Sequence, residues 1–446
     1  MRLFKYKPLD ENLTARFVVP VVLENTFTTF VGLVISQVVS TISASALVAV
    51  GMATSVMGIV SALFNMLTTG TGILFYRQVG AEEYSDAAET VEQATFMGLF
   101  STLGFTAVCL LAAEPILRLF MPNAEPAMVK ESVGYFSVVV CGLPFQVLRG
   151  VFGAVCRGLG DSRTPLAAAV STNLCQLVFA WVFVHFCHLD EIGVGLAGVL
   201  CNLVGTAVLF RALARRSGRL KLRLRNMLLP RAAACMRILR IGLPVSVQGI
   251  FSSFGVTLVG SMVVSLGTFE SSVYQIINTL AGFTAIPRTV CSVVIVPAVG
   301  HLVGAKRYKD ARKAGGLVFA ATSAAGVLLN LLMIPFAEPL CGLYSSDPAT
   351  VQAAASLLWI VLPTELVWNA MFATDGMLSA GGDTVSMMTF TLLALWCVRV
   401  PLTYLVCFVW PMGAVGVICV NIVLGFVRAS LGLLRLHSGK WIRQKV

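Results

Sequence analysis

The chain has 446 residues, of which 57% are hydrophobic and only 12% are charged, and its formal net charge is +11. Its mean hydropathy is +0.87, whereas soluble domains have roughly 45–50% apolar and about 25% charged residues. This composition excludes a soluble protein and indicates an integral membrane protein. Long apolar runs, rather than short alternating strands, also exclude a transmembrane β-barrel.

The apolar runs predict about twelve membrane-spanning helices, each long enough to cross a hydrocarbon core of about 30 Å. In chain order they cover residues 17–42, 46–76, 88–113, 131–156, 164–186, 193–214, 238–265, 270–300, 312–336, 350–379, 384–409 and 412–436. Residues 1–16 lack the apolar core and cleavage site of a signal peptide, so the first span is expected to remain as an uncleaved anchor. The predicted fold class is an all-α polytopic membrane protein.

Lys and Arg in the loops predict the orientation of these spans. Residues 211–240 hold ten of them, residues 306–313 hold five more, and the loops on the opposite side are mainly acidic. We therefore expect a multi-pass protein of the inner (plasma) membrane with both termini in the cytoplasm. The net positive charge is then explained by the orientation of the protein in the lipid bilayer, and no nucleic-acid partner is expected.

The sequence repeats itself at an offset of about 224 residues. The matching pairs are Arg16 with Arg240, Pro20 with Pro244, Phe27 with Phe251, Gly80 with Gly304, Glu114 with Glu338 and, at an offset of about 222, Asp161 with Asp383. We expect two six-helix lobes, residues 1–215 and 236–446, joined by a basic cytoplasmic linker, residues 216–235. Because each half has an even number of spans, the lobes should be related by a pseudo-two-fold axis along the membrane normal, with the substrate site between them.

Motifs of the common enzyme and metal-site classes are missing from the sequence. The twelve cysteines form no CxxC pair and no Cys/His cluster at metal spacing, so neither a metal nor a cofactor is expected. There is no HExxH, GxSxG or Walker motif, which argues against an enzyme and against a pump driven by ATP.

Carboxylates inside apolar spans are rare, because each costs about 2.5–3.5 kcal/mol at mid-helix, and they mark functional sites. Glu24 lies in the first span and Glu365 near the middle of the tenth. Asp375 lies nearer the cytoplasmic end of the tenth span, where a solvated helix end would explain it equally well. A low-dielectric site favours a neutral carboxyl group, which suits a proton relay, so these three residues are the predicted ion-coupling residues. Sodium is the alternative coupling ion.

Arginines at similar depth offer a structural explanation for the same carboxylates. Arg288 and Arg399 lie deep in the eighth and eleventh spans and are the predicted charge partners. Glu365 and Arg399 could form a purely structural ion pair. Glu24 has no equally deep basic residue in its half except Arg149, which favours a coupling role for Glu24.

Further polar and aromatic side chains within the spans are predicted to line a substrate cavity. Those that follow Glu24 form a polar stripe at helical spacing, and Gln248 takes the place of Glu24 in the second half, so the halves are not electrically equivalent. The predicted cavity residues are Asn25, Phe27, Thr28, Ser36, Asn173, Gln176, Gln248, Phe251, Gln275 and Trp368.

Several short motifs, in order along the chain, resemble those of a known family. Residues 157–165, with the sequence RGLGDSRTP, resemble the loop between the fourth and fifth spans of multidrug and toxic compound extrusion (MATE) transporters, and residues 381–384, GGDT, resemble its echo in the second half. Gly51, Gly80–Ala81, Gly242–Leu243–Pro244 and Gly304–Ala305 also fit. The resemblance covers nearly the whole chain and extends to the multidrug/oligosaccharidyl-lipid/polysaccharide exporter superfamily.

This resemblance implies two six-helix lobes, a central cavity, and efflux of cationic or amphipathic small molecules by an antiporter that uses a proton or sodium gradient. One position departs from the family, because the acid that many bacterial members carry in the first span is replaced here by Ile35–Ser36. The alternative function is a flippase for a lipid-linked saccharide or a related lipid precursor. The chain is expected to act as a monomer.

Overall fold

A computed structural model describes residues 11–40, 44–120, 126–215, 220, 222–223, 225–345, 347–361, 364–410 and 412–443. A few side chains within helices, that of Ser36 among them, lie outside the described residues. Over the described ranges the chain is almost wholly helical and contains no strand. Its contacts divide it into two compact units, Ala15–Ser246 and Val247–Val446.

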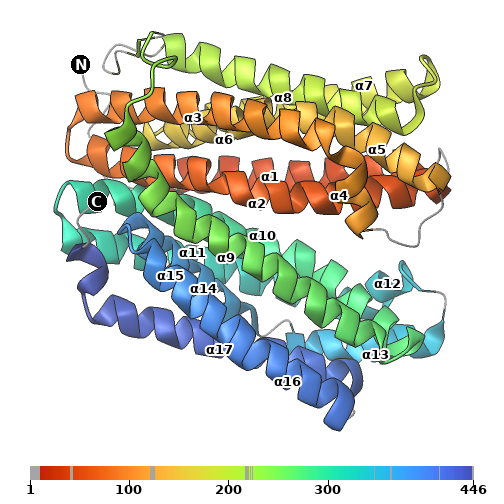
Figure 1. The fold of residues 1–446 in the computed structure, drawn as a ribbon. Helices are drawn as coiled ribbons and strands as arrows, with labels where there is room; N and C mark the ends of the chain where they lie inside the picture. The colour runs from red at the N-terminus through yellow and green to blue at the C-terminus, as the bar shows by residue number, and fades with distance from the viewer. Residues whose placement is uncertain are drawn as a thin grey trace. The chain divides into compact units, whose positions relative to one another are not determined.

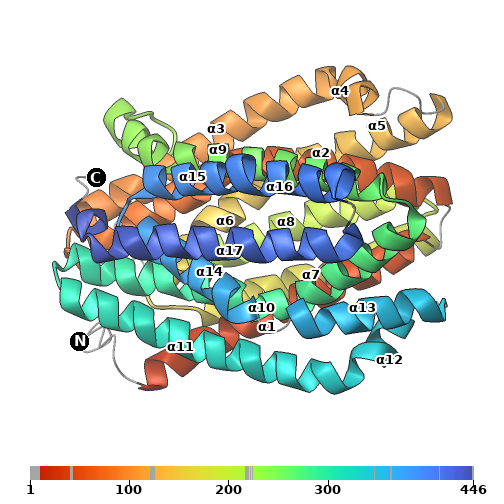
Figure 2. The same ribbon diagram turned by 90° about the horizontal axis from the view of Figure 1, so that it is seen from below.

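Within each unit, the helices lie side by side along a common direction (Figures 1 and 2). The first unit contains α1 (Glu11–Ser40), α2 (Ala44–Gly80), α3 (Tyr84–Leu111), α4 (Ala113–Phe120), α5 (Pro126–Cys141), α6 (Leu143–Gly158), α7 (Arg163–His185), α8 (Asp190–Arg215) and the first part of α9 (Ala232–Val264). The second unit contains the rest of α9, followed by α10 (Thr268–Gly304), α11 (Tyr308–Met333), α12 (Ala337–Gly342), α13 (Pro348–Val361), α14 (Glu365–Ala380), α15 (Thr384–Leu392), α16 (Val400–Tyr404) and α17 (Gly413–His437). Short 3₁₀ turns, η1 (Ile334–Phe336) and η5 (Lys440–Arg443), and π-helical turns, η3 (Leu393–Arg399) and η4 (Leu405–Val409), complete it.

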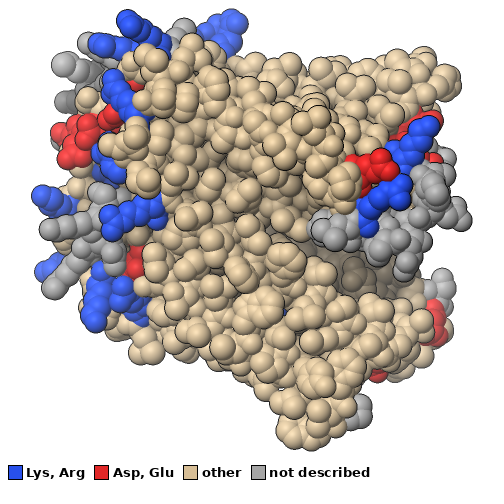
Figure 3. All heavy atoms as spheres, viewed as in Figure 1, with Lys and Arg blue, Asp and Glu red and all other residues tan. Residues whose placement is uncertain are grey.

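The helices confirm the predicted all-α membrane fold. In the described part of the chain, nine helices are long and apolar enough to cross a membrane, and eleven if each of two bent pairs, α5–α6 and α13–α14, is one span. Among the described side chains of α1, an apolar stretch covers Val18–Gly32. On the face seen in Figure 3, most Lys and Arg side chains lie at one end of the helices, a few charged side chains lie at the other end, and the surface between them is almost wholly uncharged, as a lipid-facing surface requires.

The two halves repeat each other down to individual backbone hydrogen bonds. Helices α2 and α10 both have 37 residues, and each ends in the same turn. After α2, the N–H of Glu83 donates to the carbonyl of Gln78 at 2.9 Å, and after α10 the N–H of Arg307 donates to that of Leu302 at 2.8 Å. Both are the 6→1 bond of a Schellman cap, which satisfies carbonyls left free at a helix end.

The RGLGD motif and its echo form a second repeated cap. Gly160 has φ +81° and Gly382 has φ +79°, the left-handed conformation that glycine adopts without a Cβ clash. The following N–H groups, of Asp161 and Asp383, donate to carbonyls five residues back at 3.0 and 2.9 Å. The Asp161 carboxylate then accepts the N–H of Thr164 at 3.1 Å at the start of α7. The glycine and aspartate therefore end one helix and begin the next.

The boundary between the units falls within α9, later in the chain than the linker. Gly242 of α9 crosses α2 so closely that a Cβ there would lie 2.9 Å from the Cα of Met66. The Ser246 hydroxyl donates to the carbonyl of Leu63 at 2.6 Å, one turn earlier in α2. The sequence-based division into 1–215, 216–235 and 236–446 stays a prediction, while by internal contacts the first unit extends to Ser246.

Two buried polar residues of α3 hold the described part of the basic linker. Glu92 accepts the N–H of Arg223 at 2.6 Å and the side-chain amide of Asn226 at 2.8 Å. Gln93 accepts the N–H of Arg231 at 2.8 Å and donates to the carbonyl of Asn226 at 3.1 Å. Because Glu92 is only 3% exposed, the linker backbone supplies the partners that its buried charge requires.

We predict that Glu92→Ala loosens the linker. The change removes hydrogen bonds to a charged group, each worth about 1.5–3 kcal/mol, so the linker should open about tenfold more often or more. Limited trypsin digestion in detergent, followed by mass spectrometry, should show faster cleavage between residues 219 and 231. Glu83→Ala, at an exposed residue of the preceding turn, is the matched control, and equal cleavage of the two variants would contradict the prediction.

Candidate functional site

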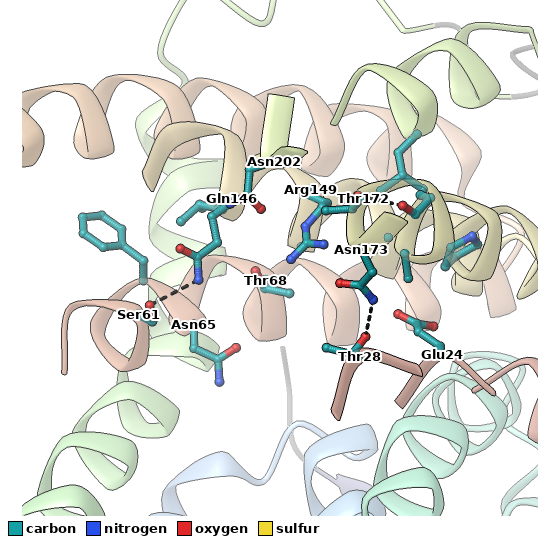
Figure 4. Close-up of a pocket in the computed structure, with 18 of the residues that line it drawn as sticks. Glu24, Thr28, Ser61, Asn65, Thr68, Gln146, Arg149, Thr172, Asn173 and Asn202 are labelled. Carbon is teal, nitrogen blue, oxygen red and sulfur yellow. Dashed lines mark hydrogen bonds between the residues drawn. The ribbon is translucent and has the colours of Figure 1, made fainter. Parts of the chain in front are cut away.

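The first unit encloses a polar cavity of about 740 Å³ between α1, α2, α6, α7 and α8 (Figure 4). Each helix contributes side chains at helical spacing, such as Ser61, Asn65 and Thr68 from α2. The polar and charged lining residues are Glu24, Asn25, Thr28, Ser61, Asn65, Thr68, Gln146, Arg149, Arg157, Thr172, Asn173, Gln176 and Asn202. The volume falls in the range of about 300–1,000 Å³ that is usual for small-molecule sites.

An ion pair and two hydrogen bonds link the helices around this cavity. Glu24 Oε2 of α1 lies 3.6 Å from Arg157 Nη1 of α6. The Asn173 amide of α7 donates to the Thr28 hydroxyl at 3.0 Å, and the Gln146 amide of α6 donates to the Ser61 hydroxyl at 3.3 Å. Figure 4 shows both hydrogen bonds spanning the cavity wall. Glu24, Asn25 and Thr28 of α1 therefore face the cavity, and Glu24 is balanced by an arginine.

A second arginine, Arg149, directs its guanidinium into the same cavity, toward Thr68 and Asn173 (Figure 4). Gly205 of α8 makes room for its stem, since a Cβ there would lie 2.9 Å from Arg149 Cδ. Glu24 attracts Arg149 over a distance, but among the described residues no carboxylate forms an ion pair with it. With Arg157 paired to Glu24, the lining therefore has an excess of one positive charge.

The second unit encloses a smaller cavity of about 170 Å³, lined by residues of α10, α13, α14, α17 and η3. Glu365, which is 4% exposed, pairs with Arg288 at 2.9 Å between its Oε2 and the arginine Nη1. The Arg288 guanidinium lies over the Trp368 ring, 5.5 Å from its centre, a cation–π contact that stabilises a desolvated charge.

Three polar atoms that line this smaller cavity have no hydrogen-bond partner among the described residues. They are Glu365 Oε1, Arg399 Nε and Asn421 Oδ1. Arg399 ends the π-helical turn η3, just before Pro401, whose missing N–H interrupts the regular helical pattern. A ligand or water that bridges these atoms would satisfy a donor and two acceptors.

The structure corrects three expectations about charge partners. Glu365 pairs with Arg288 rather than Arg399, because α10 packs directly on α14. Glu24 has a partner, Arg157, that the sequence placed only in the loop motif. Asp375 is not a solvated helix end, since its carboxylate is mostly buried and pairs with Arg428 of α17 at 2.5 Å.

The predicted cavity residues fall into distinct groups. Asn25, Thr28, Asn173 and Gln176 line the first cavity, and Trp368 lines the second. The others whose side chains are described line neither of these cavities: they are Phe27, Gln248, whose side-chain oxygen is buried, Phe251 against Trp396, and the exposed Gln275. The side chain of Ser36 lies outside the described residues.

Sequence reasoning missed most of the α6 contribution. Gln146, Arg149, Gly153 and Arg157 recur at intervals of three or four residues and so share one helix face. That spacing, in a span otherwise apolar, was the available signal. Among the described residues, no three His, Cys, Asp or Glu side chains lie together as metal ligands would.

The chain is similar to known proteins over most of its length. The MatE family model matches residues 20–182 and 244–405. The probable multidrug resistance protein NorM of Thermotoga maritima is 23% identical over 443 residues, which cover 97% of this chain and 93% of that protein. A solved outward-facing multidrug resistance MATE transporter of the MOP superfamily has a TM-score of 0.88 at 20% identity, over 97% of this chain and 96% of that chain.

A MOP superfamily transporter from Pyrococcus furiosus, for which reverse polarity of the binding pocket suggests a different function, has a TM-score of 0.87 at 19% identity. The match covers 97% of this chain and 96% of that chain. These structures share the fold. Because the family model matches both halves over most of the chain, the protein belongs to the MatE family and is a membrane transporter rather than an enzyme.

Proposed function

We propose that the protein is a secondary active exporter that moves amphipathic small molecules out of the cell by alternating access. The observation that carries this proposal is the polar first-unit cavity, which is large enough for a small molecule and holds an intramembrane carboxylate, Glu24. Transporters built from repeats bind substrate and coupling ion where the repeats meet, whereas the site that we propose here is the cavity that the first unit encloses. The function proposed for the two halves is to expose this cavity to each side of the membrane in turn.

The proposed driving force is a proton gradient, with Glu24 and Glu365 as the main carriers. Glu24 lies in the larger cavity with a loose ion pair of 3.6 Å, so a proton can replace Arg157 at modest cost. Glu365 is only 4% exposed, and its Oε1 has no hydrogen-bond partner among the described residues, so this oxygen is available to a proton. Asp375 ranks third, because its short ion pair with Arg428 favours the charged carboxylate and so opposes protonation. Sodium is the less favoured ion.

The charge of the substrate distinguishes the two candidate classes, which are cationic small molecules and lipid-linked saccharides. A cationic substrate, as the sequence resemblance implies, would have to compete with Arg157 for Glu24. The reverse pocket polarity described for the Pyrococcus relative bears on this chain, because the first-unit cavity has two arginines for one glutamate. A flippase for a lipid-linked saccharide is the alternative function, and the same excess of arginine is the observation that favours it.

We expect a proton gradient, acid outside, to drive export of a fluorescent amphipathic dye from proteoliposomes. If Glu24 carries the proton, Glu24→Gln should abolish gradient-driven transport and leave dye binding largely intact, because glutamine keeps the shape of the side chain but cannot ionise. Dye efflux with an imposed proton or sodium gradient measures this. Full activity of this variant, with loss in Glu365→Gln, would assign coupling to Glu365.

A double-mutant cycle should show that Arg288 is the structural partner of Glu365. Single changes, Glu365→Gln or Arg288→Gln, should destabilise the protein by roughly 3–5 kcal/mol, because each leaves a buried charge unpaired, and the double variant should recover much of the loss. Thermal unfolding in detergent measures this. Recovery on combining Glu365→Gln with Arg399→Gln instead would identify Arg399 as the partner. A stable double variant that does not transport would give Glu365 a role beyond structure.

Cysteine labelling should test the proposed orientation, with both termini and the linker in the cytoplasm. In a background without native cysteines, an impermeant maleimide should label Glu114→Cys in intact cells and should label Ser438→Cys only after permeabilisation. Both positions are exposed, and the surface pair of Glu114 with Arg118 contributes little to stability. The reverse labelling pattern would overturn the orientation.

A further inference from the structure

We propose that the first-unit cavity binds its substrate through a carboxylate or phosphate group, and that Arg149 is the residue that holds this group. The inference deepens the proposed function, because it takes the cavity to be the substrate site and names the chemical class of the substrate. That class is a small amphipathic or hydroxyl-rich molecule with at least one anionic group.

The charge balance of the lining carries the inference. Three of its residues are ionisable at neutral pH, namely Glu24, Arg149 and Arg157. Glu24 and Arg157 balance each other across 3.6 Å, and Arg149 is left without an ion pair among the described residues. An organic cation would therefore meet a carboxylate that already has a partner and an arginine that repels it. An anion would meet one free guanidinium.

The placement of Arg149 indicates a built site rather than an accidental charge. A charged residue within a membrane bundle is costly unless it has a partner, and Glu365, Asp375 and Asp383 each pair with an arginine here. Arg149 forms no ion pair with any described residue, yet Gly205 leaves space for its stem, and its guanidinium is directed into the cavity. The partner that compensates it is then a group that enters the cavity.

The neighbouring side chains suit the same chemistry. A guanidinium is a planar donor fork that matches the two oxygens of a carboxylate or phosphate. Around it lie amides and hydroxyls, from Asn65, Thr68, Gln146, Asn173 and Asn202, that can donate to further oxygens or accept from substrate hydroxyls. The cavity is also lined by Phe64, Leu143, Val147 and Leu209, which can contact an apolar part of the molecule.

Energetics favour the outward direction for such a substrate. An anion that leaves a negative-inside cell moves down the membrane potential, which for each charge is equivalent to about a fifty-fold concentration ratio per 100 mV. Export of an anion by this cavity therefore has a driving force even before any proton is exchanged.

The test is equilibrium binding to the purified full-length protein in detergent, measured by fluorescence anisotropy. The probes are rhodamine B and its ethyl ester, which share one ring system and differ in a single carboxylate. We expect the acid to bind more tightly than the ester. Arg149→Gln should weaken the acid on the order of tenfold or more and leave the ester unchanged or tighter. Glu24→Gln should act in the opposite direction and strengthen the acid.

Controls separate a charge effect from a folding effect. Arg118→Gln removes an exposed arginine of α4 outside the cavity and should change neither dye. Arg149→Lys keeps the charge without the fork, so it should retain part of the preference for the acid even if Arg149→Gln fails to fold. Equal losses for both dyes, or tighter binding of the ester to the unmodified protein, would overturn the proposal.

Competition assigns the source of the anionic group. Displacement of the acid by dihexanoyl phosphatidic acid, but not by dihexanoyl phosphatidylcholine, would point to a lipid headgroup, and displacement by phenyl phosphate would point to a soluble anion. Both results support the proposal, and displacement by neither overturns it. Gradient-driven transport of the ester without preferential binding of the acid would sustain the exporter and reject only the anionic class.

Discussion

The pairing of buried carboxylates with arginines is the constraint on which much of the bundle's interior depends. In a medium of low dielectric constant an unpaired charge is costly, and removing one partner of a buried pair is far more destabilising than removing both. Glu365 with Arg288 and Asp375 with Arg428 each join two helices of the second unit, and Asp383 with Arg435 joins the turn before α15 to α17. These pairs fix which helices must lie together, and the apolar contacts then fill the space between them.

The two halves share the backbone geometry of their helix caps but differ in the charged residues that line their cavities. Helix ends after α2 and α10 use the same hydrogen bonds, and the glycine–aspartate caps recur at 160–161 and 382–383. Yet the arginines of the first cavity, Arg149 and Arg157, have no counterparts in the second, whose arginines come from α10 and η3. Both halves need these caps because their helices must end in the same way for the chain to fold. The charge of a cavity serves function instead, so it can differ between the halves.

The sequence was sufficient for the fold because hydropathy and loop charge act over whole spans. Length and apolarity predicted the helices, and the repeat predicted that the halves match. Partners within the membrane could not be predicted in the same way, because Arg157 belongs to a motif that looks like a loop, and Arg288 lies 77 residues from Glu365. The sequence gives the depth of a residue within its own span but not the helix that packs beside it. It therefore did not distinguish Arg288 from Arg399 as the partner of Glu365.

The sign of the substrate's charge decides which carboxylate can exchange protons for it. Binding of two ligands is reciprocally linked, so whatever a proton on Glu24 does to substrate affinity, the substrate does to that proton. A cation and a proton would exclude each other at Glu24, which is the requirement for exchange within one cavity. An anion at Arg149 would instead be attracted more strongly once Glu24 is neutral, so proton and anion would bind together. If the substrate is an anion, proton exchange has to occur at a carboxylate outside the first cavity. Glu365 meets that condition, because it is buried in the second unit and its Oε1 accepts no hydrogen bond from the residues that the structure describes.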